Sequence, residues 1–294
     1  MYLLLPLLAA IAFALGSIVF KRAYAEGAGV VHALVVNNVV LGIVFLPLLG
    51  LDANPVPWRD WHQPVLTAVA FVFGHLLNVV SLRVGDVSVA TPLLGAKVIF
   101  VALLGWLMFG TRLTAGQWFA TALATAGVAV MGLTDFRPGK KAGLTTATAL
   151  GCAGAFALTD VMIQTWASGF GVFNFLALQF AALAVLSAAA LPVFGLRSLR
   201  APARAWKWIA AAAALSAFQA ILITGTIAAW KDAAGVNVVY ATRGLWSIAL
   251  VWLAGHWLGN TERHTAGGRR MGFRLAGGAL ILAAVVLTMK RSGE

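Results

Sequence analysis

Long apolar runs recur along the whole chain and constrain its fold more than any other feature. A helix needs about 20 apolar residues to cross the hydrocarbon core of a bilayer, and ten runs of roughly that length are separated by short charged or turn-forming segments. They are Tyr2 to Phe20, Val30 to Gly50, Pro64 to Leu82, Val87 to Phe109, Gln117 to Leu133, Leu144 to Trp166, Val172 to Leu191, Trp208 to Trp230, Val236 to Leu258 and Met271 to Met289. The sequence therefore predicts an all-α, polytopic membrane bundle of ten transmembrane helices.

The charged residues support a membrane protein and exclude several other classes. Only 10% of the residues are charged, and 21 Lys and Arg stand against nine Asp and Glu. Most of these charges lie between the apolar runs, where they suit lipid headgroups rather than nucleic acid. Most of the basic residues follow the odd-numbered runs, so the positive-inside rule places those loops in the cytoplasm and both termini outside.

Motifs for catalysis and for metal or nucleotide binding are missing from the sequence. It contains no HExxH, no GxxxxGK[ST] loop and no cluster of Cys and His, and Cys152 is its only cysteine. The segments between apolar runs are too short to fold as a catalytic domain. We therefore expect no enzyme activity, no cofactor and no bound metal.

Two of the apolar runs resemble each other. Residues 87–110 (VSVATPLLGAKVIFVALLGWLMFG) align without a gap with residues 236–259 (VNVVYATRGLWSIALVWLAGHWLG), with identical residues at Val87, Val89, Gly95, Ile99 and Gly110. The alignment pairs the fourth run with the ninth, and an odd number of spans per half inverts the second half in the membrane. The sequence predicts two inverted five-helix repeats, residues 1–134 and 143–294, joined by a basic loop at 135–142.

Two segments resemble a known transporter family. ALGSIVFKRA (14–23) is similar to the end of the first helix, and FGTRLTAGQWFATALATAGVAVMGL (109–133) to the junction of the fourth and fifth helices, in ten-helix EamA-like members of the drug/metabolite transporter superfamily. Leu15 stands where the family usually has tryptophan, and Thr111 where it commonly has an acidic residue. The resemblance implies a multi-pass secondary transporter of the bacterial inner membrane, with YddG-type amino-acid exporters nearest in length and architecture.

Lys97 lies near the middle of the fourth apolar run, about 15 Å from either end at 1.5 Å per residue. A lysine cannot snorkel that far, and a charge at the bilayer centre costs about 2.5 to 3.5 kcal/mol on insertion scales. Two interpretations can coexist. In the first, Lys97 forms a structural ion pair, for which Asp160 on the sixth run is the favoured partner. In the second, Lys97 attracts an anionic substrate group into a cavity.

The ninth run carries a second embedded cation, Arg243. Its guanidinium can bind a carboxylate through two parallel hydrogen bonds, and Tyr240, on the same helical face, offers a flat apolar wall. The alternative is that Arg243 snorkels to the nearer interface. Ser247 extends this face, and Asn237 precedes it by one turn; Trp246 is a further candidate contact.

Polar residues also occur inside the third and eighth runs. His75 and Asn78 are one turn apart, and Gln219 lies at a similar depth; interhelical hydrogen bonding alone also explains such residues. We predict a substrate site of Lys97, Arg243, Tyr240, His75, Asn78, Ser247, Trp246 and Gln219. Asp160 and His75 are the candidates for carrying a coupling proton.

Small residues suggest where helices pack or bend. Ala122 and Ala126 on the fifth run, and Gly277 and Gly278 on the tenth, predict packing surfaces for the scaffold or for a dimer. Pro92 and Gly95 predict a bend in the fourth run, and Gly244 a related bend in the ninth.

These features together favour a secondary transporter that exports small metabolites, above all amino acids, by alternating access. Two embedded cations against one acid favour a substrate that carries a carboxylate, so lipophilic cations should be poor substrates. The alternatives are a multidrug or organic-anion transporter of the same superfamily and, in another class, a lipid scramblase or a scaffold without transport. We expect membrane lipids and the substrate as partners, no nucleic acid, and a monomer or homodimer.

Overall fold

The computed structural model describes residues 2–29, 31–53, 55–84, 93–133, 142–195, 199–254 and 268–291, and their regular structure is entirely helical. The helices are α1 (Leu4–Ala25), η1 (His32–Val36), α2 (Asn37–Phe45), η2 (Leu46–Leu48), η3 (Trp58–Asp60), α3 (His62–Val84), α5 (Lys97–Phe109), α6 (Ala115–Leu133), α7 (Ala142–Phe170), α8 (Val172–Ala189), α9 (Leu191–Phe194), α10 (Ala203–Trp230), α11 (Ala233–Tyr240), α12 (Arg243–Ala254) and α13 (Gly268–Arg291). Every predicted apolar run overlaps one of these helices or a consecutive group of them.

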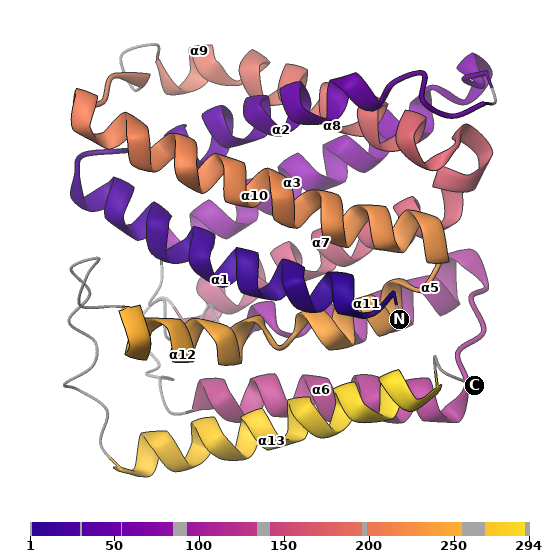
Figure 1. Cartoon of the computed structure of the whole chain (residues 1–294), viewed down its shortest axis with the longest axis vertical. Helices are drawn as coiled ribbons and strands as arrows, with labels where there is room; N and C mark the ends of the chain where they lie inside the picture. Colours follow the sequence, from indigo (N-terminus) through magenta and orange to yellow (C-terminus); the bar gives the residue numbers. More distant parts are fainter. Residues whose placement is uncertain are drawn as a thin grey trace.

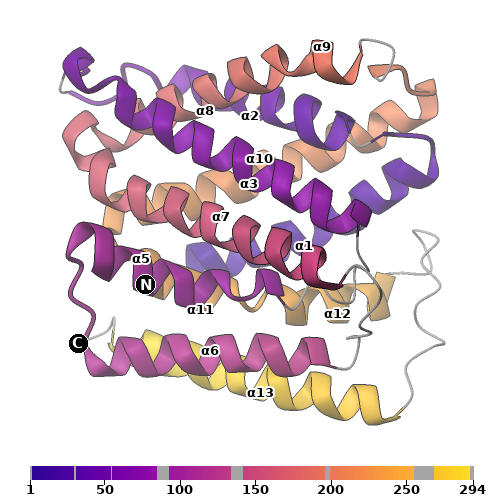
Figure 2. The ribbon, with the colours of Figure 1, turned by 180° about the vertical axis from the view of Figure 1, so that it is seen from behind.

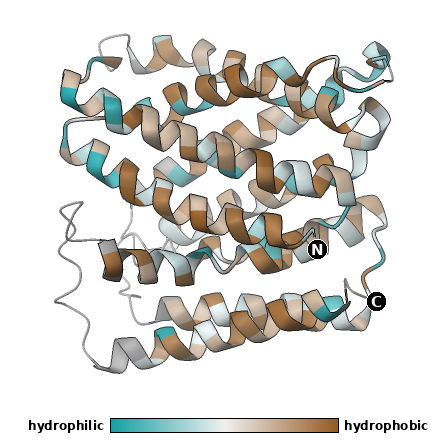
Figure 3. Ribbon diagram, in the orientation of Figure 1, coloured by the Kyte–Doolittle hydropathy of each residue, from teal (hydrophilic) through white to brown (hydrophobic). Residues whose placement is uncertain are grey.

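Length and composition make this a multi-pass membrane protein. Five described helices are long and apolar enough to cross a membrane, at Leu4–Ala25, Gly143–Phe170, Val172–Val193, Ala203–Trp230 and Gly272–Lys290, and shorter apolar helices accompany them. Large apolar side chains such as Phe73, Leu107 and Leu253 are exposed on the outside, and Figure 3 shows apolar residues along most helices. The predicted fold class, an all-α polytopic membrane bundle, is confirmed.

The most extensive helix contacts join α1 with α10, α3 with α7, α2 with α8 and α6 with α13. The α1–α10 pair lies on the near face of the bundle in Figure 1, and α3 and α7 face the viewer in Figure 2. Each of these pairs takes one helix from residues 1–134 and one from residues 143–294. The two halves of the chain are therefore interleaved along the whole bundle.

Helices α1 and α10 run antiparallel, and small side chains let them approach closely. Tyr2 stacks on Trp230 at one end of the pair, with ring centroids 5.4 Å apart, and Glu26 forms an ion pair with Arg204 at the other. Between them, a Cβ on Gly16 would lie 3.5 Å from Leu215. Close backbone approach at small residues is the usual way in which membrane helices gain packing energy.

The α6–α13 contact bears out Gly277 of the tenth run as a packing residue, but on the fifth run it does not use the predicted Ala122 and Ala126. Ala122 and Ala126 are exposed, and Gly127 instead faces α13, where an added Cβ would lie 2.7 Å from the carbonyl oxygen of Gly277. Small residues occur on more than one face of α6, so composition alone identifies the helix and not its packing face. The contact lies within one chain and belongs to the scaffold.

The fourth and the ninth span are each interrupted near their middle. A turn at Gly95 and Ala96 precedes α5, as predicted, whereas Pro92 lies outside the described residues. In the ninth span, α11 ends at Tyr240 and α12 begins at Arg243, so the break at Ala241 and Thr242 lies just before the predicted position at Gly244. At this break the Val239 carbonyl oxygen accepts two hydrogen bonds from Thr242, from its backbone N–H at 3.1 Å and from its hydroxyl at 2.7 Å.

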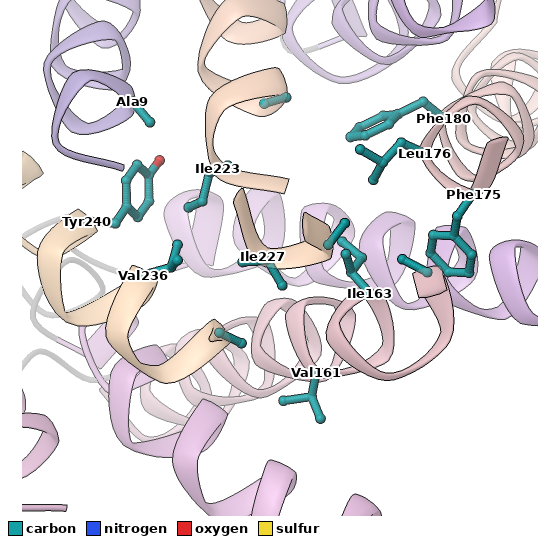
Figure 4. Packing of buried hydrophobic residues seen from close by; sticks show 14 of the residues in the cluster. Ala9, Val161, Ile163, Phe175, Leu176, Phe180, Ile223, Ile227, Val236 and Tyr240 are labelled. Atoms are coloured by element: carbon teal, nitrogen blue, oxygen red, sulfur yellow. The ribbon is translucent and has the colours of Figure 1, made fainter. Parts of the chain in front are cut away.

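The termini lie at the same end of the bundle (Figure 1), as an even number of spans requires. The buried apolar residues between the helices form three clusters, of which one is much larger than the others. Figure 4 shows Tyr240 at one edge of the largest cluster, beside Ala9, and Phe175, Leu176 and Phe180 at the opposite edge. Tyr240 thereby connects the packed core with the polar residues described next.

Candidate functional site

Lys97 forms the predicted ion pair with Asp160. Its Nζ lies 2.7 Å from Oδ2 of Asp160, and the two side chains are only 12% and 8% exposed. Lys97 is the first residue of α5, directly after the turn at Gly95, and Asp160 lies on α7. The pair therefore links the fourth and sixth spans in the interior of the bundle.

Asn237 of α11 is the third member of this group. Its Nδ2 donates to Asp160 Oδ2 at 2.6 Å and to the carbonyl oxygen of Ala233 at 2.9 Å. Asn237 is 2% exposed, so the hydrogen bond is made away from bulk water. Three helices meet on one carboxylate, which offsets the cost of burying both charges.

Arg243 lies beside this group and contacts two aromatic rings. Its Cζ is 4.7 Å from the ring centroid of Tyr240 and 5.1 Å from that of Phe13 on α1. Lys97 Nζ lies 6.0 Å from the Tyr240 ring. Both cations therefore contact the same tyrosine at distances typical of cation–π interactions.

The central group carries more positive than negative charge. Among the described residues no carboxylate lies within ion-pair distance of Arg243, whereas Asp160 is already bonded to Lys97 and Asn237. We call Lys97, Asp160, Asn237, Tyr240 and Arg243 the central polar group. Its surplus positive charge suits an anionic group of a bound molecule.

A cavity of about 420 Å³ lies at the end of the bundle that holds the N-terminus, and none of its lining residues belongs to the central polar group. Val101, Val161 and Ala234 line it, and each lies within about one helical turn of Lys97, Asp160 or Asn237 in sequence. The polar part of its lining consists of Tyr2, Thr111, Arg112, Gln117, Gln164, Lys231, Asp232 and Thr288. The cavity thus offers a polar mouth and an apolar inner wall.

Hydrogen bonds at the mouth of the cavity connect four segments of the chain. Tyr2 Oη donates to Asp232 Oδ2 at 2.7 Å, and Asp232 Oδ1 accepts from the backbone N–H of Gly235 at the start of α11. Gln164 of α7 accepts from the N–H of Ala233 at 2.7 Å and donates to Thr111 at 3.4 Å. The N-terminus of α11 is therefore fixed by side chains from two other helices.

His75 belongs to a different cluster from the one predicted. Its Nδ1 lies 3.3 Å from Nδ2 of Asn38, which also donates to the Ser187 hydroxyl at 2.9 Å. The His75 ring meets the edges of Phe71 and Phe156 at 4.7 and 5.3 Å. Phe156 lies on the same helix as Asp160, one turn before it, and its ring contacts His75 and Phe71.

The other predicted site residues are distributed as follows. Ser247 donates to the carbonyl oxygen of Arg243 at 2.8 Å, within its own helix. Trp246 packs against the apolar core, and Gln219 is half-buried on α10. The Oδ1 atom of Asn78 is buried and has no hydrogen-bond partner among the described residues. The structure thus brings together Lys97, Tyr240, Arg243 and Asp160 from the predicted set.

Sequence reasoning missed Phe13 as a neighbour of Arg243 and Asn237 as the partner of Asp160. Phe13 gives no signal in an apolar run, because large apolar side chains occur throughout it. Asn237 did give a signal, because an amide inside a transmembrane helix requires a hydrogen-bond partner. Asp160 was the acid in the spans that could accept from it.

Comparisons with known proteins agree with this architecture. Residues 1–133 match the model of the EamA-like transporter family. A solved structure, titled only as the crystal structure of a protein, is similar to the chain with a TM-score of 0.72 and 16% sequence identity, over 97% of this chain and 95% of that one. The comparison with curated proteins found no match. The first half thus has the sequence pattern of a membrane transporter, and the whole chain has a fold known from solved structures.

Proposed function

We propose that the chain is an EamA-like secondary transporter that carries small carboxylate-bearing solutes, above all amino acids, across the bacterial inner membrane. The family match of residues 1–133 and the multi-pass helical fold support a transporter. Export is the direction that the resemblance to amino-acid exporters implies. The single observation that carries the choice of substrate is the surplus positive charge around Tyr240.

A carboxylate fits the central polar group for electrostatic reasons. Lys97 and Arg243 both lie within 6.0 Å of the Tyr240 ring, and one acid, Asp160, accompanies them. A substrate carboxylate at this point would neutralise the surplus charge and accept hydrogen bonds from the planar guanidinium. The ammonium group of an amino acid would then pair with Asp160, whose Oδ2 lies 2.7 Å from Lys97 Nζ.

The contact pattern supports two repeats that move against each other. Exchanging the first and second five spans turns the α1–α10 pair into the α7–α3 pair, and leaves the α2–α8 and α6–α13 pairs in place. These four pairs are the most extensive ones in the bundle. Such an exchange is expected of repeats related by a two-fold axis, the arrangement in which a central site is exposed to each side in turn.

We propose that the substrate reaches the central polar group through this cavity, from one side of the membrane. Its inner wall at Val101, Val161 and Ala234 lies within about one helical turn of the central polar group. This arrangement favours a transporter over a lipid scramblase, because Lys97 and Asp160 are buried between helices rather than presented to lipid. We place the substrate between this wall and the Tyr240 ring.

Uptake into liposomes that contain the purified protein tests the proposal. The panel comprises zwitterionic amino acids, monocarboxylates without an amino group, and tetraphenylphosphonium as a lipophilic cation, each with and without a pH gradient. We expect saturable flux of the carboxylate-bearing compounds and none of the cation. Transport of tetraphenylphosphonium without any carboxylate flux would contradict the proposed substrate class.

Variants of Arg243 test the site in the same assay. Arg243→Gln should lower carboxylate flux at least tenfold, and Arg243→Lys should restore only part of it, because lysine keeps the charge but lacks the planar fork. Arg59→Gln is the matched control, since Arg59 lies in the short helix η3 (Trp58–Asp60), remote in the chain from the central polar group. Equal flux in all three variants would defeat the assignment of Arg243.

A further inference from the structure

Four titratable side chains line the cavity at the end of the bundle that holds the N-terminus. They are Tyr2, Arg112, Lys231 and Asp232, and we call them the mouth group. Tyr2 precedes α1, Arg112 precedes α6, and Lys231 and Asp232 join α10 to α11 (Figure 1). Three segments that are far apart in the sequence thus meet around one cavity.

Hydrogen bonds between helices hold the backbone that carries the mouth group. Tyr2 Oη donates to Asp232 Oδ2 at 2.7 Å. Gln164 of α7 donates to Thr111 at 3.4 Å and accepts from the N–H of Ala233 at 2.7 Å. Gln164 therefore ties the segment before α6 to the segment before α11.

Both cations of the mouth group lack an acidic partner. The oxygens of Asp232 accept from the Tyr2 hydroxyl and from the N–H of Gly235 at 2.9 Å. Among the residues that the structure describes, no carboxylate lies within ion-pair distance of Arg112 or Lys231. Arg112 follows the fourth apolar run and Lys231 the eighth, so the positive-inside rule does not account for these two charges.

Lys231 has a backbone conformation that lysine disfavours. Its φ of 52° and ψ of 35° lie in the left-handed region, and no other residue except glycine has a positive φ in the described part of the chain. The position after a helix often has this conformation, but glycine usually occupies it because a Cβ is crowded there. Residues in strained conformations cluster at functional sites, which fits a role for the Lys231 side chain in the cavity that it lines.

The mouth group repeats the titratable composition of the central polar group. Each set has one lysine, one arginine, one aspartate and one tyrosine. In each set the tyrosine contacts charged members, through the hydroxyl of Tyr2 in one and through the ring of Tyr240 in the other. A solute whose charges suit one set therefore meets matching charges at the other.

We propose that the mouth group is an outer binding station for the carboxylate-bearing solute, on its path to or from the central polar group. This inference rests on the proposed function, because it gives the same solute a second position. Arg112 offers a planar fork for the carboxylate, and Lys231 adds charge. Each oxygen of Asp232 accepts one hydrogen bond and has room for another, so the carboxylate can also accept from the ammonium group of an amino acid.

Charge-selective labelling tests the mouth group without requiring transport. Gly116→Cys places a thiol at an exposed position of the same cavity, whereas the natural Cys152 is buried. Sulfonatoethyl and trimethylammonioethyl methanethiosulfonate report the local charge through the ratio of their labelling rates, each divided by the rate with 2-mercaptoethanol. We expect this ratio to favour the anionic reagent.

Removing either cation should lower that ratio. A unit charge at about 7 to 10 Å in water changes the rate of each reagent about two- to threefold, in opposite directions, so Lys231→Gly and Arg112→Gln should each lower the ratio about four- to ninefold. Arg59→Gln is the matched control, because Arg59 is exposed, follows the second apolar run and does not line the cavity. It should change the ratio less than twofold.

Lys231→Gly also separates the role of the charge from folding. Glycine suits the left-handed conformation, so the melting temperature should rise by about 2 °C while the cavity loses a cation. Lys231→Arg keeps the charge and should keep the labelling ratio within about twofold.

L-Alanine, present during labelling of Gly116→Cys by the anionic reagent, is the probe for binding. It should slow the labelling more than propionate, which lacks the ammonium group, or ethylammonium, which lacks the carboxylate. The protection should weaken in Lys231→Gly and persist in Lys231→Arg.

The outcomes distinguish this inference from the proposed function. An unchanged labelling ratio in both Lys231→Gly and Arg112→Gln, or labelling that L-alanine does not slow, would overturn the outer station. Protection by L-alanine in a protein that carries no amino acid across liposomes would support the station and contradict the proposed function.

Discussion

Replacing Lys97 with methionine would leave the Asp160 carboxylate buried with Asn237 as its remaining partner among those described above. Breaking a buried ion pair by removing one partner costs about 3 to 5 kcal/mol, because an uncompensated charge stays behind. The Asn237 hydrogen bond, 2.6 Å long, places the expected cost at the lower end, about 3 kcal/mol. At roughly 2 °C per kcal/mol for a chain of this size, the melting temperature should fall about 6 °C.

The double variant Lys97→Met/Asp160→Asn separates charge from shape. An asparagine at position 160 still accepts from Asn237, and no charge is buried, so stability should return to within about 1 kcal/mol of the parent. Fluorescence-detected unfolding in dodecyl maltoside measures both variants. A double variant as unstable as the single one, or a single variant that melts within about 2 °C of the parent, would refute the reasoning.

Two further predictions concern packing and buried polar groups, and both are checked by the melting temperature of the purified variants. Gly277→Ala should lower the stability by about 1 to 3 kcal/mol, because its new methyl group would lie 2.9 Å from the backbone nitrogen of Met131. Gly225→Ala in α10, where no atom lies within 4 Å of the new Cβ, should raise the stability by about 0.5 to 1 kcal/mol. Equal effects of the two substitutions would contradict the packing argument. Gln179→Leu should raise the stability by about 1 to 2 kcal/mol, because both amide atoms of Gln179 are buried without a hydrogen-bond partner among the described residues. A loss of stability would show that the amide is hydrogen-bonded in the native protein.

The positions of the helices and the main ion pair could be predicted from the sequence. Membrane spans are readable because lipid requires long apolar helices whose backbone groups bond internally. Lys97 and Asp160 could be paired because a buried charge needs an opposite one, and acids are rare inside these spans. Both predictions rest on physical requirements that leave few alternatives.

Helix faces and helix interruptions were harder to predict. The ninth span breaks at Ala241 and Thr242 rather than at Gly244, and the backbone N–H and the hydroxyl of Thr242 both bond to the Val239 carbonyl oxygen there. His75 shares its helix face with Asn78, but its ring contacts Asn38 on another helix. Such outcomes depend on which helices become neighbours, and a single sequence does not specify that.

The proposed role of Arg243 depends on a residue from a distant span. Phe13 on α1 places one aromatic ring against the guanidinium and Tyr240 places another. The i, i+3 spacing on the ninth run predicted the tyrosine, whereas nothing in the first run distinguished Phe13 from its apolar neighbours. The aromatic environment explains how an arginine is tolerated at this depth without a described carboxylate partner.

Carboxylate flux through the Lys97→Met/Asp160→Asn variant in proteoliposomes tests most directly whether Lys97 meets the substrate or only stabilises the fold. The rate is normalised to the amount of reconstituted protein, and the melting temperature confirms the native fold. We predict flux below a tenth of the parent rate in a protein of nearly parental stability, because the ammonium that attracts the carboxylate is gone. Parental flux in this variant would contradict the account, since it would show that Lys97 and Asp160 form a purely structural pair.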